Sequence, residues 1–323
     1  MKRVKYIFCK SFFSIIIFFI SISISFVLIH MLPGNYLDYL LKDLAQVNPE
    51  VSVLFKEKFG LDKPLIVQYI IYLKNIFYGN WGYSLQYARP VLNIINEKLN
   101  WTLIILFPST MLSIFVGIIV GAYMGWKNGS RNDLFITNFM IFIKTIPSYW
   151  WAITFILLFS YYIKIFPLGG FTNVNALKYG VNYLDILYHA FLPILTLTLC
   201  SIPGHYYLMR NSMLSVIKEP YITVARAKGL PENYILYLHA IKNAILPMLT
   251  VISLECAHLF TGSLFIETIF SWPGMGLLTF DAIKARDFPL LQAIFLIETF
   301  LIIIANFIAD ILYLFINPCI KDN

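Results

Sequence analysis

The chain has 323 residues, of which 59% are hydrophobic and only 13% are charged. Soluble domains carry about 25% charged residues, so this composition excludes an ordinary soluble enzyme and indicates an integral membrane protein. The net charge of +7 comes from Lys and Arg beside the apolar runs, without a basic stripe of interleaved aromatics, which argues against nucleic-acid binding. The four cysteines are far apart and form no C-x-x-C pair, so neither a disulfide framework nor a zinc site is predicted.

The chain starts with a basic segment, followed by an apolar run over residues 11–32. A signal peptide has an apolar core of roughly 7–15 residues and a small-residue cleavage site, whereas this run is longer and ends in HMLPGN. We therefore predict that residues 1–32 form a cytoplasmic N-tail and an uncleaved first membrane helix. Residues 33–100 are predicted to lie outside the membrane, where the apolar segment 64–78 is too short to span and suits an interfacial helix.

Five further apolar runs reach the length of about 18 residues that a membrane-spanning helix needs. They cover residues 101–126, 134–165, 184–209, 244–270 and 289–316. The runs are continuous rather than alternating, so the predicted fold class is an all-α integral membrane protein with six transmembrane helices. The core transmembrane domain is expected over residues 101–317, with a loop at 210–243 and a tail at 318–323.

Two proline-containing segments predict local breaks. Pro147 is expected to kink the third span, and SWPGMG after the fifth span is expected to form a tight external turn. Six spans place both termini on one side of the membrane. Lys and Arg cluster in the N-tail, in loop 127–131 and in residues 210–242, which predicts that this side is the cytoplasm.

A polar, helix-forming stretch lies between two long apolar runs, over residues 219–247. Pro220 suits the first turn of a helix, where its missing N–H costs nothing. Gly229 suits the left-handed position after a helix, and Pro231 blocks continuation. The stretch thus predicts a short helix, a glycine turn and a longer second helix. From pattern alone, an amphipathic linker lying on the membrane surface explains it equally well.

The same stretch carries a resemblance to a known family. ARAKGLP, followed by HAIKNAILP, resembles the cytoplasmic EAA loop of ABC importer permeases in the oligopeptide/dipeptide/nickel branch. HMLPGN, FGLDKPLIVQY, GNWGYSL, RPVLNIINEKLNWTL and SWPGMG are similar to segments that the branch has in this order. The chain departs at Thr223, where the name of the loop has Glu, and at Val224, where it has Ala. Near the C-terminus, NPCIK resembles the branch's DPRIR, with Asn317 and Cys319 as the differences.

The resemblance implies the type I ABC importer permease fold and a transmembrane subunit in a bacterial or archaeal cytoplasmic membrane. It implies that the short helix and its turn couple to an ATP-hydrolysing subunit. The implied coupling residues are Glu219, Pro220, Tyr221, Thr223, Val224, Ala225, Arg226, Ala227, Lys228, Gly229 and Leu230. The implied partners are a second, similar permease, two ATP-binding subunits and an external solute-binding protein. Substrates of the branch are usually peptides, sometimes nickel or an oligosaccharide.

The sequence contains no G-x-x-x-x-G-K-[ST] phosphate loop, so the chain is not expected to bind ATP, and Mg²⁺ and ATP would belong to partner subunits. No catalytic or metal-binding motif is found, and the five scattered histidines are interpreted as packing or interfacial residues.

Two alternative functions stay open. A self-sufficient secondary transporter or channel would need an ion-coupling site and often inverted repeats, and a membrane-embedded enzyme would need a catalytic group at membrane depth.

Three charged residues fall inside the predicted spans: Lys144, Glu255 and Glu298. At 1.5 Å per residue they lie about 14–16 Å from the ends of their spans, near the midplane of a core roughly 30 Å thick. A lone charge there costs at least about 2.5 kcal/mol, so each is expected to face a partner or water. Lys144 is predicted either to pair with one of the two glutamates or, with them, to line the translocation path.

Overall fold

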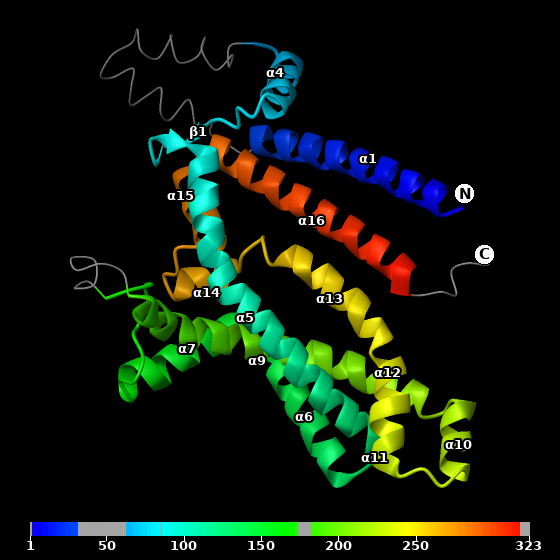
Figure 1. Cartoon of the computed structure of the whole chain (residues 1–323). Helices are drawn as coiled ribbons and strands as arrows, with labels where there is room; N and C mark the ends of the chain where they lie inside the picture. Colours follow the sequence, from blue (N-terminus) through cyan, green and yellow to red (C-terminus); the bar gives the residue numbers. More distant parts are fainter. Residues whose placement is uncertain (1, 32–62, 85, 174–181, 317–323) are drawn as a thin grey trace. The chain divides into compact units, whose positions relative to one another are not determined.

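The structure is a computed structural model, and it describes residues 2–31, 63–84, 86–173 and 182–316. These residues are mostly helical (Figure 1). The chain divides into two compact units. The first unit comprises Met1–Lys98 and Leu278–Ile303, and the second comprises Leu99–Leu277 and Ile304–Asn323.

The first unit contains the N-terminal helix and the polar region that follows it. Its complete elements are α1 (Lys2–Met31), α4 (Leu65–Phe77), and the strands β1 (Tyr83–Ser84) and β2 (Arg89–Pro90), which pair antiparallel. The hydroxyls of Ser23 on α1 and Tyr69 on α4 lie 2.6 Å apart. The helix predicted at residues 64–78 is confirmed, and its interfacial location stays a prediction.

A buried carboxylate fixes the corner between α15 (Met275–Ala285) and α16 (Phe288–Ile316). Asp287 accepts a hydrogen bond from the Ser84 hydroxyl at 2.5 Å and from the backbone N–H of Leu290 at 3.2 Å. It therefore ties the β1 strand to the first turn of α16. Burial, followed by the negative charges of Asp281 and Asp287, raises the pKa of Tyr87 beside this corner.

The second unit holds most of the helical core. It contains most of α5 (Val91–Trp126), followed by α6 (Arg131–Thr145), α7 (Ser148–Phe155), the π-helical segment η1 (Ile156–Tyr162), α9 (Tyr183–Val216), α10 (Pro220–Ala227), α11 (Glu232–Tyr234), the π-helical segment η2 (Ile235–Ala240), α12 (Ile241–Ala244), α13 (Leu246–His258) and α14 (Leu264–Ile269).

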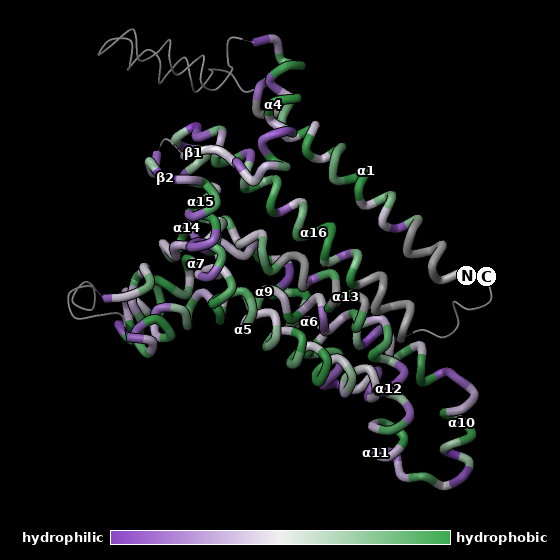
Figure 2. Tube along the Cα trace, turned by 45° about the horizontal axis from the view of Figure 1, so that its top comes forward, coloured by the Kyte–Doolittle hydropathy of each residue, from purple (hydrophilic) through white to green (hydrophobic). Residues whose placement is uncertain are grey.

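Among the described residues, four helices are long and apolar enough to cross a membrane, and a fifth crossing is possible if one bent pair counts as a single span. The four candidates are Cys9–Val27, Val91–Trp126, Tyr183–Val216 and Phe288–Ile308. The bent pair joins Arg131–Thr145 to Ser148–Tyr162 at 92°, which confirms the break predicted at Pro147. The hydropathy of these helices can be followed in Figure 2.

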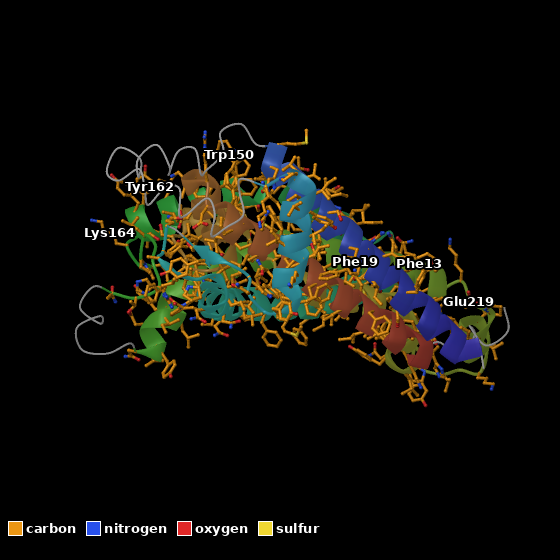
Figure 3. The ribbon with its side chains drawn as sticks, turned by 90° about the horizontal axis from the view of Figure 1, so that it is seen from above. Phe13, Phe19, Trp150, Tyr162, Lys164 and Glu219 are labelled. Atoms are coloured by element: carbon orange, nitrogen blue, oxygen red, sulfur yellow. The ribbon has the colours of Figure 1, made fainter. Side chains whose placement is uncertain are left out.

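The outer faces of several helices present large apolar side chains, as a lipid-facing surface requires. Phe13 and Phe19 project from α1, and Trp150 and Tyr162 project from the α7–η1 arm (Figure 3). All four side chains are exposed within the chain itself. This pattern supports the prediction of a protein embedded in a bilayer.

The fifth span, predicted as one helix over residues 244–270, is wrong in that form. α13 ends at His258, the backbone turns through Gly262 at φ +76°, and α14 starts at Leu264. A buried carboxylate accounts for this break in the helix. The buried Glu267 carboxylate accepts hydrogen bonds from the Thr102 hydroxyl and from the backbone N–H groups of Ser263, Gly276 and Leu277. The three backbone donors are available only because the backbone leaves the helix on both sides of α14.

The turn predicted at SWPGMG folds back onto α5. Trp272 is fully buried, and its indole N–H donates to the carbonyl oxygen of Trp101 at 2.8 Å. Ser271 takes a positive φ of +51° at the start of the turn. The turn is therefore part of the core, and its location outside the membrane stays a prediction.

The backbones of α5 and α9 approach closely along three glycines spaced four residues apart, Gly117, Gly121 and Gly125. An added Cβ would lie 2.3 Å from the Cβ of His205 at the first glycine, 2.6 Å from the Tyr206 carbonyl oxygen at the second, and 2.7 Å from the Met213 Cβ at the third. Small residues at this spacing let membrane helices pack backbone to backbone. The signal for this contact is local, since the G-x-x-x-G-x-x-x-G pattern can be read directly in the sequence.

We expect Gly121→Ala to destabilise the protein by about 1–3 kcal/mol, because its methyl group would overlap the α9 backbone. Gly204→Ala on α9 is the matched control, since its Cβ would meet nothing within 4 Å, and alanine is the better helix former. The measurement is the thermal unfolding midpoint of the purified protein in detergent. Equal midpoints for the two variants would contradict the close α5–α9 packing.

Candidate coupling site and intramembrane polar contacts

The helix predicted at the centre of the polar stretch is present as α10, and its boundaries follow the sequence signals. Pro220 occupies the first turn, and the helix ends at Ala227. Gly229 follows with φ +75°, a conformation that costs glycine little. The second helix starts at Glu232 as α11 and continues through η2 into α12. The helix–glycine–helix prediction is therefore confirmed.

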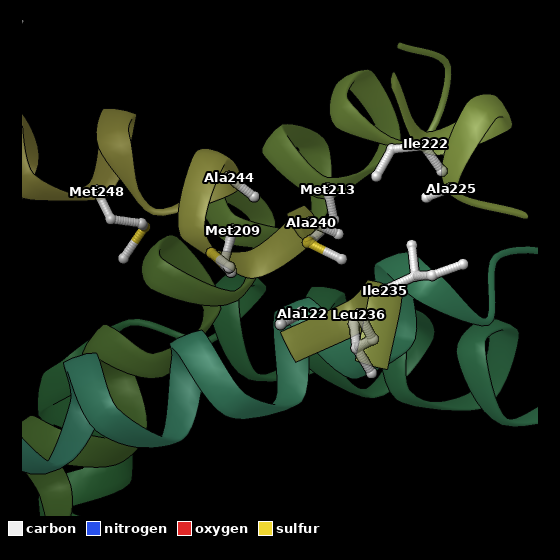
Figure 4. Close-up of a cluster of buried hydrophobic side chains, with 10 residues drawn as sticks. All are labelled: Ala122, Met209, Met213, Ile222, Ala225, Ile235, Leu236, Ala240, Ala244 and Met248. Atoms are coloured by element: carbon white, nitrogen blue, oxygen red, sulfur yellow. The ribbon is translucent and has the colours of Figure 1, made fainter. Parts of the chain in front are cut away.

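One face of α10 belongs to an apolar core shared with α5, α9, η2, α12 and α13 (Figure 4). Ile222 and Ala225 are the buried residues of α10. We call the whole set the lever core: Ala122, Met209, Met213, Ile222, Ala225, Ile235, Leu236, Ala240, Ala244 and Met248. Leu230 packs against its edge. Close packing of this kind opposes movement of α10 independently of its neighbours.

The opposite face of α10 is open to solvent in the chain. Thr223, Val224, Ala227 and Lys228 are exposed, and Val224 leaves 52% of its surface uncovered. Figure 2 shows polar and apolar residues mixed around α10. The implied coupling residues therefore divide into two sets, because Ala225 lies in the lever core while Thr223, Val224 and Ala227 are exposed.

The remaining residues of the stretch are placed around this helix. Tyr221 accepts a hydrogen bond from the Asn243 side chain at 3.0 Å. Glu219 and Pro220 are exposed at the start of α10, and Glu219 makes no side-chain cap. Figure 3 labels Glu219 on this part of the chain.

Arg226 holds the turn between α10 and the second helix. Its Nε and Nη2 atoms donate to the Glu232 carboxylate at 2.9 and 3.3 Å, and its guanidinium lies 5.1 Å from the centre of the Trp126 ring. Both members of the ion pair are exposed, so the pair contributes at most about 1 kcal/mol. Arg226 therefore supports the shape of the turn, in addition to lying beside the exposed face.

An ion pair with a buried carboxylate anchors the C-terminal half of α9. Arg210 donates to both oxygens of Asp133 at 2.8 Å, and its Nη2 also donates to the Asn128 side chain at 3.0 Å. The Asp133 side chain is 1% exposed. A bidentate pair fixes the guanidinium in one orientation. In the sequence, Arg210 contributes only to the charge bias, because no local pattern identifies Asp133, 77 residues away, as its partner.

The three charges predicted inside the membrane have different surroundings. Glu255 on α13 lies 2.7 Å from Nε2 of His205 on α9. Lys144 on α6 is exposed, and its ammonium lies 5.8 Å from the centre of the Tyr207 ring. Glu298 on α16 is half-buried in the first unit. Within the second unit, Glu255 thus pairs with His205, one of the histidines predicted from the sequence to be packing or interfacial residues.

Comparison with known proteins decides the family. The family described as binding-protein-dependent transport system inner membrane component matches residues 117–322, and its N-terminal counterpart matches residues 3–106. The chain belongs to this family. The α5–α9 contact, α10 and the lever core all lie within the larger match or at its edge.

Relatives of this permease have names that specify peptides. It is 33% identical over 300 residues to the oligopeptide transport system permease protein AppB of Bacillus subtilis, with 92% of this chain and 93% of that protein covered. It is 32% identical over 322 residues to the dipeptide transport system permease protein DppB of Escherichia coli K12, with 94% and 95% covered. One solved chain, from an amino acid ABC transporter, overlays on 69% of the permease at 15% identity, with a TM-score of 0.48.

We expect Asp133→Ala to destabilise the permease by about 3–5 kcal/mol, because it leaves the Arg210 guanidinium partly buried without its carboxylate. Glu97→Ala is the control, since its ion pair with Arg89 is exposed on both sides and its loss should cost less than about 1 kcal/mol. Thermal unfolding midpoints of the two purified variants give the comparison. A similar midpoint for both would show that the Asp133 pair does not hold α6 to α9.

Proposed function

We propose that this permease is one transmembrane half of an ATP-driven importer and that α10 docks on an ATP-hydrolysing partner subunit. The observation that supports this most directly is the division of α10 into two faces. Ile222 and Ala225 fasten the helix to the lever core, while Thr223, Val224 and Lys228 remain uncovered. A linker lying on a membrane would bury its apolar face in lipid, whereas this face is already buried in protein.

The lever core would transmit the movement of the ATPase to the membrane helices. A displacement of α10 moves Ile222 and Ala225, which contact residues of α9, η2 and α12 in one cluster. A packed core transmits such a displacement instead of absorbing it. Closure of the ATPases around ATP would then favour one orientation of the path over the other, as coupling between two states requires. In this proposal ATP and Mg²⁺ are bound by the partner subunits.

The names of the relatives support a peptide as the substrate. AppB and DppB are named for oligopeptide and dipeptide transport, and each aligns with more than nine-tenths of this chain. The family description, binding-protein-dependent transport, supports an external solute-binding protein that delivers the substrate. The proposed complex also contains a second, similar permease and two ATP-binding subunits. A self-sufficient secondary transporter would leave the exposed face of α10 without a role.

The proposed topology keeps six crossings in the cytoplasmic membrane, with both termini in the cytoplasm. The third crossing is the pair bent at Pro147, and the fifth is α13 followed by the break at Gly262 and by α14. A broken crossing is tolerated in a membrane when its free backbone groups are satisfied within the protein. The Glu267 carboxylate accepts hydrogen bonds from the N–H of Ser263 at this break and from the N–H groups of Gly276 and Leu277 at the start of α15.

We expect Gly229→Pro to abolish peptide uptake and the co-purification of ATPase subunits with the permease. Proline fixes φ near −65°, whereas Gly229 requires +75°. Gly229→Asn is the matched control, because asparagine tolerates the left-handed conformation, and it should retain most of the uptake. Normal retention of the ATPase by the proline variant would argue against docking through this turn.

The topology predicts opposite labelling of two exposed positions. A cysteine introduced by Lys228→Cys should react with an impermeant maleimide only after intact cells are opened, because α10 is expected in the cytoplasm. A cysteine introduced by Asn80→Cys should react in intact cells. Each variant is compared with the unsubstituted protein, which has four cysteines of its own. Reaction at Lys228→Cys from outside would refute the orientation and the coupling proposal together.

A further inference from the structure

A carboxylate and an imidazole meet inside the helical core of the second unit. Nε2 of His205 lies 2.7 Å from Oε2 of Glu255, and its Nδ1 lies 3.0 Å from the carbonyl oxygen of Ser201. The His205 side chain is 2% exposed, whereas 32% of the Glu255 side chain remains exposed. His205 is further confined by the close approach of Gly117 on α5. The histidine is therefore held rigidly, while part of the carboxylate stays accessible.

The hydrogen-bond partners determine how many protons the pair needs. The Ser201 carbonyl oxygen can only accept, so Nδ1 must carry a proton. The short contact between Nε2 and Oε2 needs a second proton, placed on either atom. Both placements leave His205 and Glu255 with zero net charge together. A neutral pair lowers the cost of keeping Glu255 at membrane depth.

The accessible edge of Glu255 needs a polar neighbour. Within the described residues its carboxylate has His205 as a hydrogen-bond partner on one oxygen. At the membrane depth that the sequence predicts for Glu255, an exposed carboxylate edge is too costly to place in lipid, so we expect it to face water or a polar ligand. Two cations of the second unit have other contacts, because Arg210 binds Asp133 and Lys144 lies 5.8 Å from the centre of the Tyr207 ring.

The chemistry of the site favours an ammonium group over a metal ion. Among the described residues there is no group of three or more His, Cys, Asp or Glu side chains that could hold a metal, and metal sites need several such ligands. One carboxylate edge can accept a charge-assisted hydrogen bond from an ammonium. A peptide carries an ammonium at its N-terminus.

We propose that the exposed edge of Glu255, positioned by His205, is a binding site for the ammonium group of the transported peptide. The assignment rests on the proposed function, because it requires that peptides pass along α13. Glu255 contacts the ligand, and His205 acts as a positioning residue. Removing a hydrogen bond to the charged ammonium group should slow uptake at least about tenfold.

The test is a zero-length cross-link in membrane vesicles that contain the complete transporter. A carbodiimide joins a carboxylate to an amine that touches it, with loss of water. With isotope-labelled trialanine as the probe, mass spectrometry should find an adduct on Glu255. N-acetyl-trialanine, which lacks the ammonium, should give none. Uptake of trialanine without an adduct on Glu255 would overturn the assignment and leave the proposed function standing. Absence of any peptide uptake would overturn both.

Substitutions separate the two roles. Glu255→Gln should abolish the adduct and lower the uptake of trialanine, whereas Glu97→Gln, on an exposed ion pair, should change neither. His205→Gln retains an N–H donor toward Glu255 and should give a higher adduct yield than His205→Leu. Equal adduct yields from the two histidine variants would contradict the positioning role of His205. If a variant fails to accumulate in the membrane, the cross-link on the unsubstituted chain still decides whether Glu255 contacts the peptide.

Discussion

The close approach of α5 and α9 at three glycines is the constraint on which the rest of the second unit depends. Gly117 faces His205, Gly121 faces Tyr206 and Met209, and Gly125 faces Arg210 and Met213. Each contact fixes a residue of α9 that makes a further interaction. Backbone-to-backbone packing leaves little freedom to rotate or slide, so the positions of these α9 side chains are set together.

Three interactions extend from that face of α9. His205 contacts Glu255 on α13, Arg210 contacts Asp133 at the start of α6, and Met209 and Met213 enter the lever core. Two of them involve groups that are costly to bury unless they are paired. The third connects α9 to α10. One helix face thereby connects the proposed peptide contact with the proposed ATPase contact.

The lever core explains why α10 suits a mechanical role. A short helix of eight residues is marginal in isolation. Here Ile222 and Ala225 anchor it, and Arg226 braces the following turn through Glu232 and Trp126. The helix therefore moves with the core, while its outer face stays available. Gly229 allows the chain to turn between α10 and α11, because glycine adopts the required positive φ at little cost.

The sequence by itself determined the membrane character, the long apolar helices α1, α5, α9 and α16, the break at Pro147 and the extent of α10. These features follow from local rules: the length of apolar runs, the missing N–H of proline and the freedom of glycine at positive φ. The family followed from motifs whose order is written in the sequence. The glycine spacing on α5 indicates a close contact with another helix, but it does not identify α9 as that helix.

Only the tertiary structure decided what depends on residues distant in sequence. The fifth apolar run breaks near Gly262 because Glu267 gathers donors from Thr102 and from the turn after α14, which no local pattern indicates. Glu255 contacts His205, 50 residues away, because α9 and α13 pack side by side. Ala225 faces the core instead of the solvent because residues of α9, η2 and α12, distant in sequence or on the next helix, pack in the same cluster. Apolar composition specifies that a helix is buried, and packing decides which neighbour covers each face.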